Sequence, residues 1–146
     1  MVGDTYRIVL DGKQTGGAFA VIDMLIPPGG GPGPHAHPGV QETFYVVAGE
    51  VLVKSEAGSS TARAGAYVSI PRGGAIHSFK NISSATAHLL CTVTPAGMEE
   101  MFRELGQPIA VGSFAPPPVL GPLELKRFGA VAEKYGQILY PPDRLD

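Results

Sequence analysis

Residues 29–49 read GGGPGPHAHPGVQETFYVVAG and pass from a glycine-rich loop through two histidines into an apolar run. His35 and His37 are two positions apart, so both imidazoles project from the same face of an extended strand. Glu42 opens the next β-rich run, and a turn through Pro38-Gly39 can bring its carboxylate back beside the histidines. The stretch therefore predicts three donor groups for one ion on neighbouring strands.

Short β-rich runs separated by turn residues predict an all-β barrel or sandwich. No helix-length pattern interrupts them, which argues against a parallel α/β sheet. The predicted strands are Tyr6–Leu10, Ala18–Ile26, Thr43–Val47, Val51–Lys54, Ala66–Ile70, Ile76–Lys80 and Ala87–Thr94.

After Pro95 the apolar pattern changes to a helical period. Four apolar residues at helical spacing predict a short amphipathic helix before Gly106: Met98, Met101, Phe102 and Leu105. A second helix is predicted from Pro122 to Tyr135, with five residues on its apolar side: Leu125, Phe128, Val131, Ala132 and Tyr135. We therefore expect one domain over residues 1–146, with a barrel core at about 5–95 and a helical tail at about 96–146.

The net charge of the chain and the length of its apolar runs limit the kinds of partner that we expect it to bind. The formal net charge is −2 at pH 7 and no basic run occurs, so we expect neither nucleic acid nor a membrane as a partner. No signal-like N-terminus or membrane-spanning apolar run is found, so a cytoplasmic location is expected. The single cysteine, Cys91, is expected to be a small buried hydrophobe without a chemical role.

His77 extends the predicted donor set. It follows the turn residues 71–74 at the start of a later strand, and we expect it to complete the set across the barrel. Three imidazoles and one carboxylate without a thiolate suit iron, manganese, nickel, copper or zinc. We predict one divalent transition metal ion, held by His35, His37, Glu42 and His77.

The spacing Gly29-x5-His35-x-His37-x4-Glu42-x6-Gly49 matches the first cupin motif at every defining position. The resemblance covers residues 18–95. It implies the cupin fold, a double-stranded β-helix or jelly-roll barrel, to which the tail adds a short α-helical C-terminal appendage. The tail is itself similar to that of small quercetin dioxygenase-like cupins.

The second cupin motif is resembled by Gly65-x5-Pro71-x-Gly73 followed by His77-x3-Asn81. The resemblance implies that His77 is the fourth ligand. One residue is inserted between the motif glycine and His77, so we expect either that Gly74 takes the turn role or that the strand entry bulges.

Cupins that resemble this chain are commonly dioxygenases of enol or flavonol-like compounds. The resemblance therefore implies a metal-dependent oxidoreductase with a small-molecule substrate, and we expect Glu42 to act as a catalytic base as well as a ligand. Phe44 and Val46 share the alternation of Glu42 and are expected to line the substrate pocket, whereas Tyr45 should point away.

Two other functions stay open. One is a non-oxidative metal-dependent isomerase, epimerase, cyclase or lyase, and the other is a non-catalytic small-molecule binding cupin. Resembling cupins usually pair through their sheets, and the segment Tyr6–Leu10 would otherwise leave an open edge, so a homodimer is expected. His88 is expected to face outward because of its place in the strand alternation.

Overall fold

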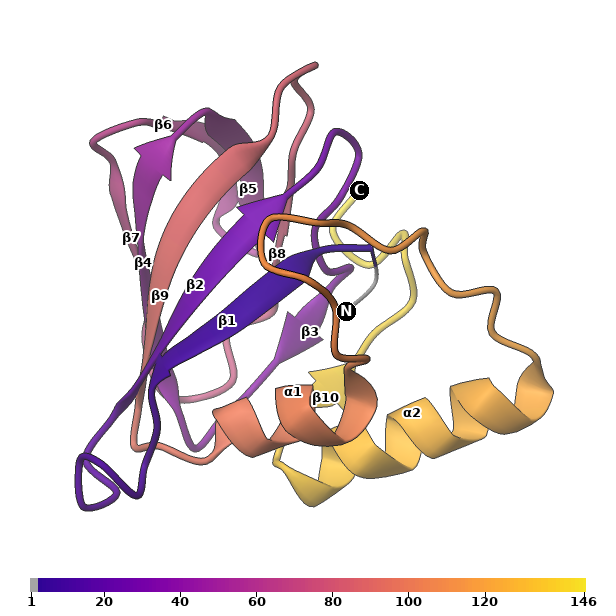
Figure 1. The fold of residues 1–146 in the computed structure, drawn as a ribbon. Coiled ribbons are helices and arrows are strands. Elements are labelled where there is room, and N and C mark those ends of the chain that lie inside the picture. Colours follow the sequence, from indigo (N-terminus) through magenta and orange to yellow (C-terminus); the bar gives the residue numbers. More distant parts are fainter. Residues whose placement is uncertain (1–2) are drawn as a thin grey trace.

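The computed structural model describes residues 3–146. Over these residues the chain forms ten strands and two helices (Figure 1). The strands are β1 (Thr5–Leu10), β2 (Ala20–Ile26), β3 (His35–Ala36), β4 (Gln41–Ala48), β5 (Glu50–Ser55), β6 (Gly58–Arg63), β7 (Tyr67–Ile70), β8 (His77–Lys80), β9 (Ala87–Thr94) and β10 (Ile138–Leu139). The helices are α1 (Met98–Leu105) and α2 (Pro122–Lys134).

Two five-stranded sheets make up the barrel wall (Figure 1). The first has the order β1-β2-β9-β4-β7, and the second has the order β10-β3-β8-β5-β6. The strand pairs within both sheets are antiparallel. The all-β barrel expected from the sequence is confirmed.

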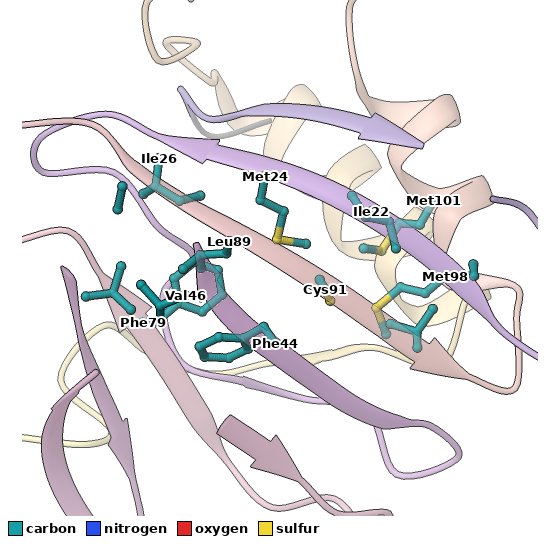
Figure 2. Close-up of a cluster of buried hydrophobic side chains, with 14 of the residues drawn as sticks. Ile22, Met24, Ile26, Phe44, Val46, Phe79, Leu89, Cys91, Met98 and Met101 are labelled. Atoms are coloured by element: carbon teal, nitrogen blue, oxygen red, sulfur yellow. The ribbon is translucent and has the colours of Figure 1, made fainter. Parts of the chain in front are cut away.

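Alternating side chains on β2 and β9 build the core between the sheets (Figure 2). The inward residues of the two strands are direct cross-strand partners, and each is at most 2% exposed. Burying one large aliphatic side chain stabilises a fold by about 1.5–3 kcal/mol, so this layer fixes the register of the sheet. The pairs are Ala20–Val93, Ile22–Cys91, Met24–Leu89 and Ile26–Ala87.

The turn between β4 and β5 requires Gly49. Its φ angle is +75°, a conformation that side chains with a Cβ rarely adopt. A Cβ at this position would also lie 2.9 Å from the Cα of Ala87. Gly49 therefore allows the end of β4 to pass close to β9.

The two helices lie side by side at one end of the barrel (Figure 1). Met98 and Met101 of α1 and Val131 and Ala132 of α2 are buried in the same hydrophobic cluster as the sheet residues. The short strand β10 then pairs with β3 and joins the second sheet. The C-terminal tail thus packs on the barrel through both helices and a strand.

Several sequence expectations need correction. Strands β6 and β10 are absent from the prediction, because β6 is largely exposed without apolar alternation and β10 has two residues. Strand β3 is missing from the predicted runs as well, although His35 and His37 are expected on an extended segment. Helix α1 is confirmed. Helix α2 is confirmed in position, but Leu125 is 56% exposed rather than packed, because the N-terminal half of α2 extends beyond the barrel (Figure 1).

None of the helices formed by residues 3–146 has the length and apolar character needed to cross a membrane.

Candidate metal centre

The four predicted ligands come from both sheets. His35 of β3 and His77 of β8 are direct cross-strand partners in the second sheet. Glu42 lies on β4 of the first sheet, where it pairs with Val93 and Ile70. His77 therefore lies beside His35 and not across the barrel from it, which corrects the expectation; Glu42 is the residue that reaches across. Strand order cannot be read from spacing, so the sequence could not distinguish the two arrangements.

The extra residue before His77 is accommodated in the turn. Gly73 and Gly74 both have positive φ angles, 114° and 82°, and the Gly73 N–H donates to the Pro38 carbonyl at 3.0 Å. Strand β8 begins at His77 and pairs with β5 in regular register from Ser55. Gly74 thus takes the turn role, and the strand entry does not bulge.

The four side chains converge on one point in the barrel interior. His35, His37, Glu42 and His77 each offer one ligand atom, and these atoms all lie within 4.8 Å of one another. Glu42 Oε2 is 3.0 Å from the Nε2 atoms of both His37 and His77. All four residues are at most 6% exposed. No other group of three or more potential metal ligands converges within residues 3–146.

Backbone carbonyls orient the three imidazoles. His35 Nδ1 is 2.9 Å from the Gly33 oxygen, and His77 Nδ1 is 2.9 Å from the Ala75 oxygen. His37 Nδ1 makes a longer contact of 3.4 Å with the Val40 oxygen. A carbonyl can only accept, so each Nδ1 donates, and each neutral ring presents a bare Nε2 lone pair. Such carbonyl contacts are the usual supports of metal-binding histidines.

The donor set fits a divalent cation. Bare Nε2 atoms and a carboxylate oxygen are all acceptors, so a cation or a proton must lie between them to compensate their charge. Two atoms bound at about 2.1 Å from one ion and at right angles are about 3.0 Å apart. The distances from Glu42 Oε2 to His37 and His77 Nε2 have that value. The residues present are therefore compatible with one metal ion.

Comparison with known proteins gives the family. Residues 22–93 match the family model described as "Cupin domain". The chain contains a cupin domain. All four residues of the candidate metal centre lie within the matched stretch of this cupin.

One curated relative is similar to most of the chain. Quercetin 2,3-dioxygenase of Bacillus subtilis (strain 168) is 28% identical over 109 residues, which cover 74% of this chain and 32% of that protein. The chain thus spans about a third of the length of this curated relative. The similarity therefore concerns one segment of a longer protein.

Two solved structures illustrate the shared fold. A cupin-superfamily sugar phosphate isomerase from Silicibacter pomeroyi DSS-3 has a TM-score of 0.57 at 24% identity, with 63% of this chain and 59% of that chain covered. A predicted oxalate decarboxylase from Thermotoga maritima has a TM-score of 0.58 at 22% identity, with 63% and 80% covered. At these identities the similarity shows the cupin fold alone.

Burial and hydrogen bonds shift the pKa values of the candidate metal ligands. Burial lowers the pKa of His35 to about 4. Burial also opposes protonation of His37, but the hydrogen bond and charge of Glu42 outweigh it and raise the His37 pKa. Burial alone would raise the pKa of Glu42, yet hydrogen bonds with His37 and His77 hold it well below its usual value. An ionised Glu42 and a neutral His35 are the forms that bind metal ions.

Buried Cys91, which contacts Glu42, and partly buried Tyr6 are missing from the sequence prediction of the site. Cys91 Sγ lies 3.3 Å from Glu42 Oε1, and burial, followed by the Glu42 charge, raises the pKa of the thiol well above its usual value. The Tyr6 hydroxyl donates to Asp4 Oδ2 at 3.1 Å, and burial, followed by the charge of Asp4, raises the Tyr6 pKa. Alternation indicates that Cys91 faces inward, but the pairing of β4 with β9 that brings it to Glu42 has no sequence signal.

The residues expected to line the substrate pocket lie inside the barrel. Phe44 and Val46 are 1% and 0% exposed, and the Phe44 ring lies 5.3 Å from the ring of Phe79. Two surface cavities of about 220 and 620 Å³ are lined by neither of them, nor by the metal-centre residues. The substrate contact of Phe44 and Val46 stays a prediction. Tyr45 is 42% exposed and points away, as expected.

His88 belongs to a different environment. It lies on the outer face of β9, as its alternation predicts, and its Nε2 makes a short contact with Asp23 Oδ1. Asp23 also accepts from Arg7 at 3.0 Å. The cupin chain thus holds its fourth histidine outside the barrel, away from the other three.

Proposed function

We propose that this cupin is a metal-dependent oxidoreductase, a dioxygenase of a small enol or flavonol-like molecule. In this proposal, one divalent transition metal ion is bound by His35, His37, Glu42 and His77. The observation that carries it is the convergence of three imidazole Nε2 atoms and one carboxylate in the buried interior of the barrel. The similarity to a quercetin 2,3-dioxygenase supports the choice of reaction.

The donor set supports this chemistry through its charge and its size. Three neutral imidazoles and one carboxylate leave a divalent ion with net positive charge and, at six-coordination, two open positions. When bound, such an ion supplies Lewis acidity and, for a redox-active metal, one-electron chemistry with dioxygen. The absence of a thiolate among the ligands favours iron, manganese, nickel, copper or zinc.

Glu42 is the residue proposed to move a proton. Its carboxylate is ionised and buried, and it faces the same interior as the histidines. A substrate hydroxyl that enters this interior can donate its proton to a Glu42 oxygen, which leaves an enolate to be oriented by the centre. The histidines are less suited to this task, because their Nδ1 atoms donate to backbone carbonyls and their Nε2 lone pairs would be used to hold the metal ion.

The walls of the interior favour an apolar, aromatic substrate. Phe44 and Val46 share the inward face of β4 with Glu42, and Phe79 lies opposite on β8. These side chains exclude water and present rings and methyl groups to a bound molecule. We therefore propose that Phe44 and Val46 contact the substrate once it has entered the barrel.

Oxygen uptake tests the proposed reaction against its two alternatives. Protein loaded with its native metal is mixed with quercetin and with smaller enols in an oxygen electrode. The proposal expects substrate-dependent oxygen consumption that stops on removal of the metal. Product formation without oxygen would favour a non-oxidative isomerase, epimerase, cyclase or lyase. Binding without any product would favour a small-molecule binding cupin.

We also propose that two chains form a homodimer. Strand β1 is an edge strand of the first sheet, and its outer face exposes Val9 by 42%. Unprotected edges favour pairing with another chain. Light scattering at micromolar concentration should give the mass of two chains, and a monomer mass would refute the proposal. A cytoplasmic location and the absence of nucleic-acid and membrane partners stay predictions.

A further inference from the structure

The two oxygens of the Glu42 carboxylate have different partners. Oε2 lies 3.0 Å from the Nε2 atoms of His37 and His77. Oε1 lies 3.3 Å from the sulfur of Cys91. The carboxylate is thereby divided into one oxygen that faces the metal centre and one that faces a thiol.

Cys91 reaches Glu42 because of the sheet register. It lies on β9 directly opposite Phe44 of β4, while Glu42 lies two positions from Phe44 on the same inward face. Cys91 is 0% exposed and lies among the core side chains shown in Figure 2. A thiolate at this distance from a carboxylate would place two uncompensated negative charges in the interior. The sulfur therefore carries its proton and donates S–H to Oε1.

We propose that Cys91 is a positioning residue for the metal centre. Its S–H occupies Glu42 Oε1, so that Oε2 is the single oxygen presented to the metal ion and to the proton of the substrate. This inference rests on the proposed metal site. It gives a function to a residue that packing alone would otherwise explain.

The effect on the metal follows from carboxylate geometry. A carboxylate with both oxygens free can bind an ion through either oxygen or through both. A donor held on Oε1 favours one-oxygen binding through Oε2 and keeps the group from rotating. Loss of outer hydrogen bonds of this kind typically weakens metal binding by about tenfold to a hundredfold.

The hydrogen bond can be tested without reference to the metal. Cys91 is the only cysteine of the chain, so the infrared S–H stretching band of this chain belongs to Cys91 alone. The wild-type band should be broad and lie at lower frequency than that of a free thiol. Glu42→Gln replaces the carboxylate by a weaker neutral acceptor and should shift the band upward. An identical band in both proteins would overturn the inference.

Leu89→Val is the matched control for these measurements. Leu89 lies two positions from Cys91 on the same inward face of β9 and is also 0% exposed. The substitution changes core volume beside the site without touching Glu42. It should leave the S–H band unchanged.

Cobalt binding tests the consequence for the metal centre. Co²⁺ is titrated into wild type, Cys91→Ala, Cys91→Ser and Leu89→Val, and both the Kd and the visible absorption of the bound ion are recorded. Cys91→Ala should weaken binding by about tenfold or more and change the spectrum. Cys91→Ser retains a donor and should recover most of the affinity, while Leu89→Val should match wild type.

The outcomes separate this inference from the proposed function. Wild type that binds no Co²⁺ overturns the metal site together with the inference. Wild type and Cys91→Ala with the same Kd and spectrum overturn the inference and leave the metal site standing. If Cys91→Ser binds Co²⁺ as weakly as Cys91→Ala, the effect comes from the change in side-chain volume, and the inference is also overturned. Should Cys91→Ala fail to fold, the infrared comparison of wild type with Glu42→Gln still decides.

Discussion

The inner and outer faces of the sheet β1-β2-β9-β4-β7 each carry a contact between histidine and carboxylate. Inside, Glu42 meets His37 and His77, and all three are at most 4% exposed. Outside, Asp23 contacts His88 and also accepts from Arg7. The outer pair is compensated by an exposed cation of the protein itself. In the inner cluster, a proton on an imidazole or a bound cation has to compensate the buried Glu42 carboxylate, and this distinguishes the candidate site from the surface ion pair.

The largest expected effect is the difference in unfolding free energy between substitutions on the inner face and on the outer face of the sheet. Phe44 is 1% exposed and its neighbour Tyr45 is 42% exposed. Phe44→Ala removes a buried ring and should lower the free energy of unfolding by about 3–5 kcal/mol. Tyr45→Ala should cost about 1 kcal/mol or less. Urea unfolding of both variants measures the comparison, and equal losses would show that the two faces are not packed differently.

The buried carboxylate of Asp4 should make stability depend on pH. Burial raises the pKa of Asp4 to about 6, against the opposing hydrogen bonds from Tyr6 and Gly31. Between about pH 4 and pH 6 the folded protein therefore binds more protons than the unfolded chain, so stability falls as pH rises. A shift of about two pKa units corresponds to about 3 kcal/mol.

Asp4→Asn should remove this contribution. Urea midpoints measured from pH 4 to pH 7 should fall less steeply with pH in Asp4→Asn than in wild type. Equal slopes in wild type and Asp4→Asn would contradict the buried environment assigned to Asp4.

Glu42→Gln sharpens the comparison at the site itself. The amide keeps the size and one acceptor oxygen but loses charge and basicity, so turnover should fall by about a hundredfold or more. The three histidines should retain substantial metal. Steady-state kinetics and elemental analysis of the same sample measure both effects. If metal and turnover fall together, Glu42 acts chiefly as a ligand, and near wild-type turnover would exclude the base role.

The sequence predicts the local parts of this cupin well. Alternation and turn residues indicate most strands of the barrel, and the spacing of His35, His37 and Glu42 indicates the donor set. These features depend on neighbours in the chain, because side-chain direction in a strand follows from position alone. The helices are predicted for the same reason, since their apolar period is local.

Features that depend on strand pairing could not be predicted. The placement of His77 beside His35, and of Cys91 beside Glu42, follows from which strands are neighbours in the two sheets. Strand β10 is two residues long and exists because it pairs with β3, about a hundred positions earlier in the chain. Leu125 has helical spacing, but only the extent of the barrel decides that it stays exposed.

Metal content tests the central claim most directly. Wild-type protein, purified without a histidine tag, should contain one divalent transition metal ion per chain by elemental analysis. His37→Ala should lose most of it, because one of the four converging ligands is removed. His88→Ala, which changes the outer face only, should keep full occupancy. Wild type that stays metal-free after reconstitution with iron, manganese, nickel, copper and zinc, or His37→Ala with full occupancy, would contradict the account.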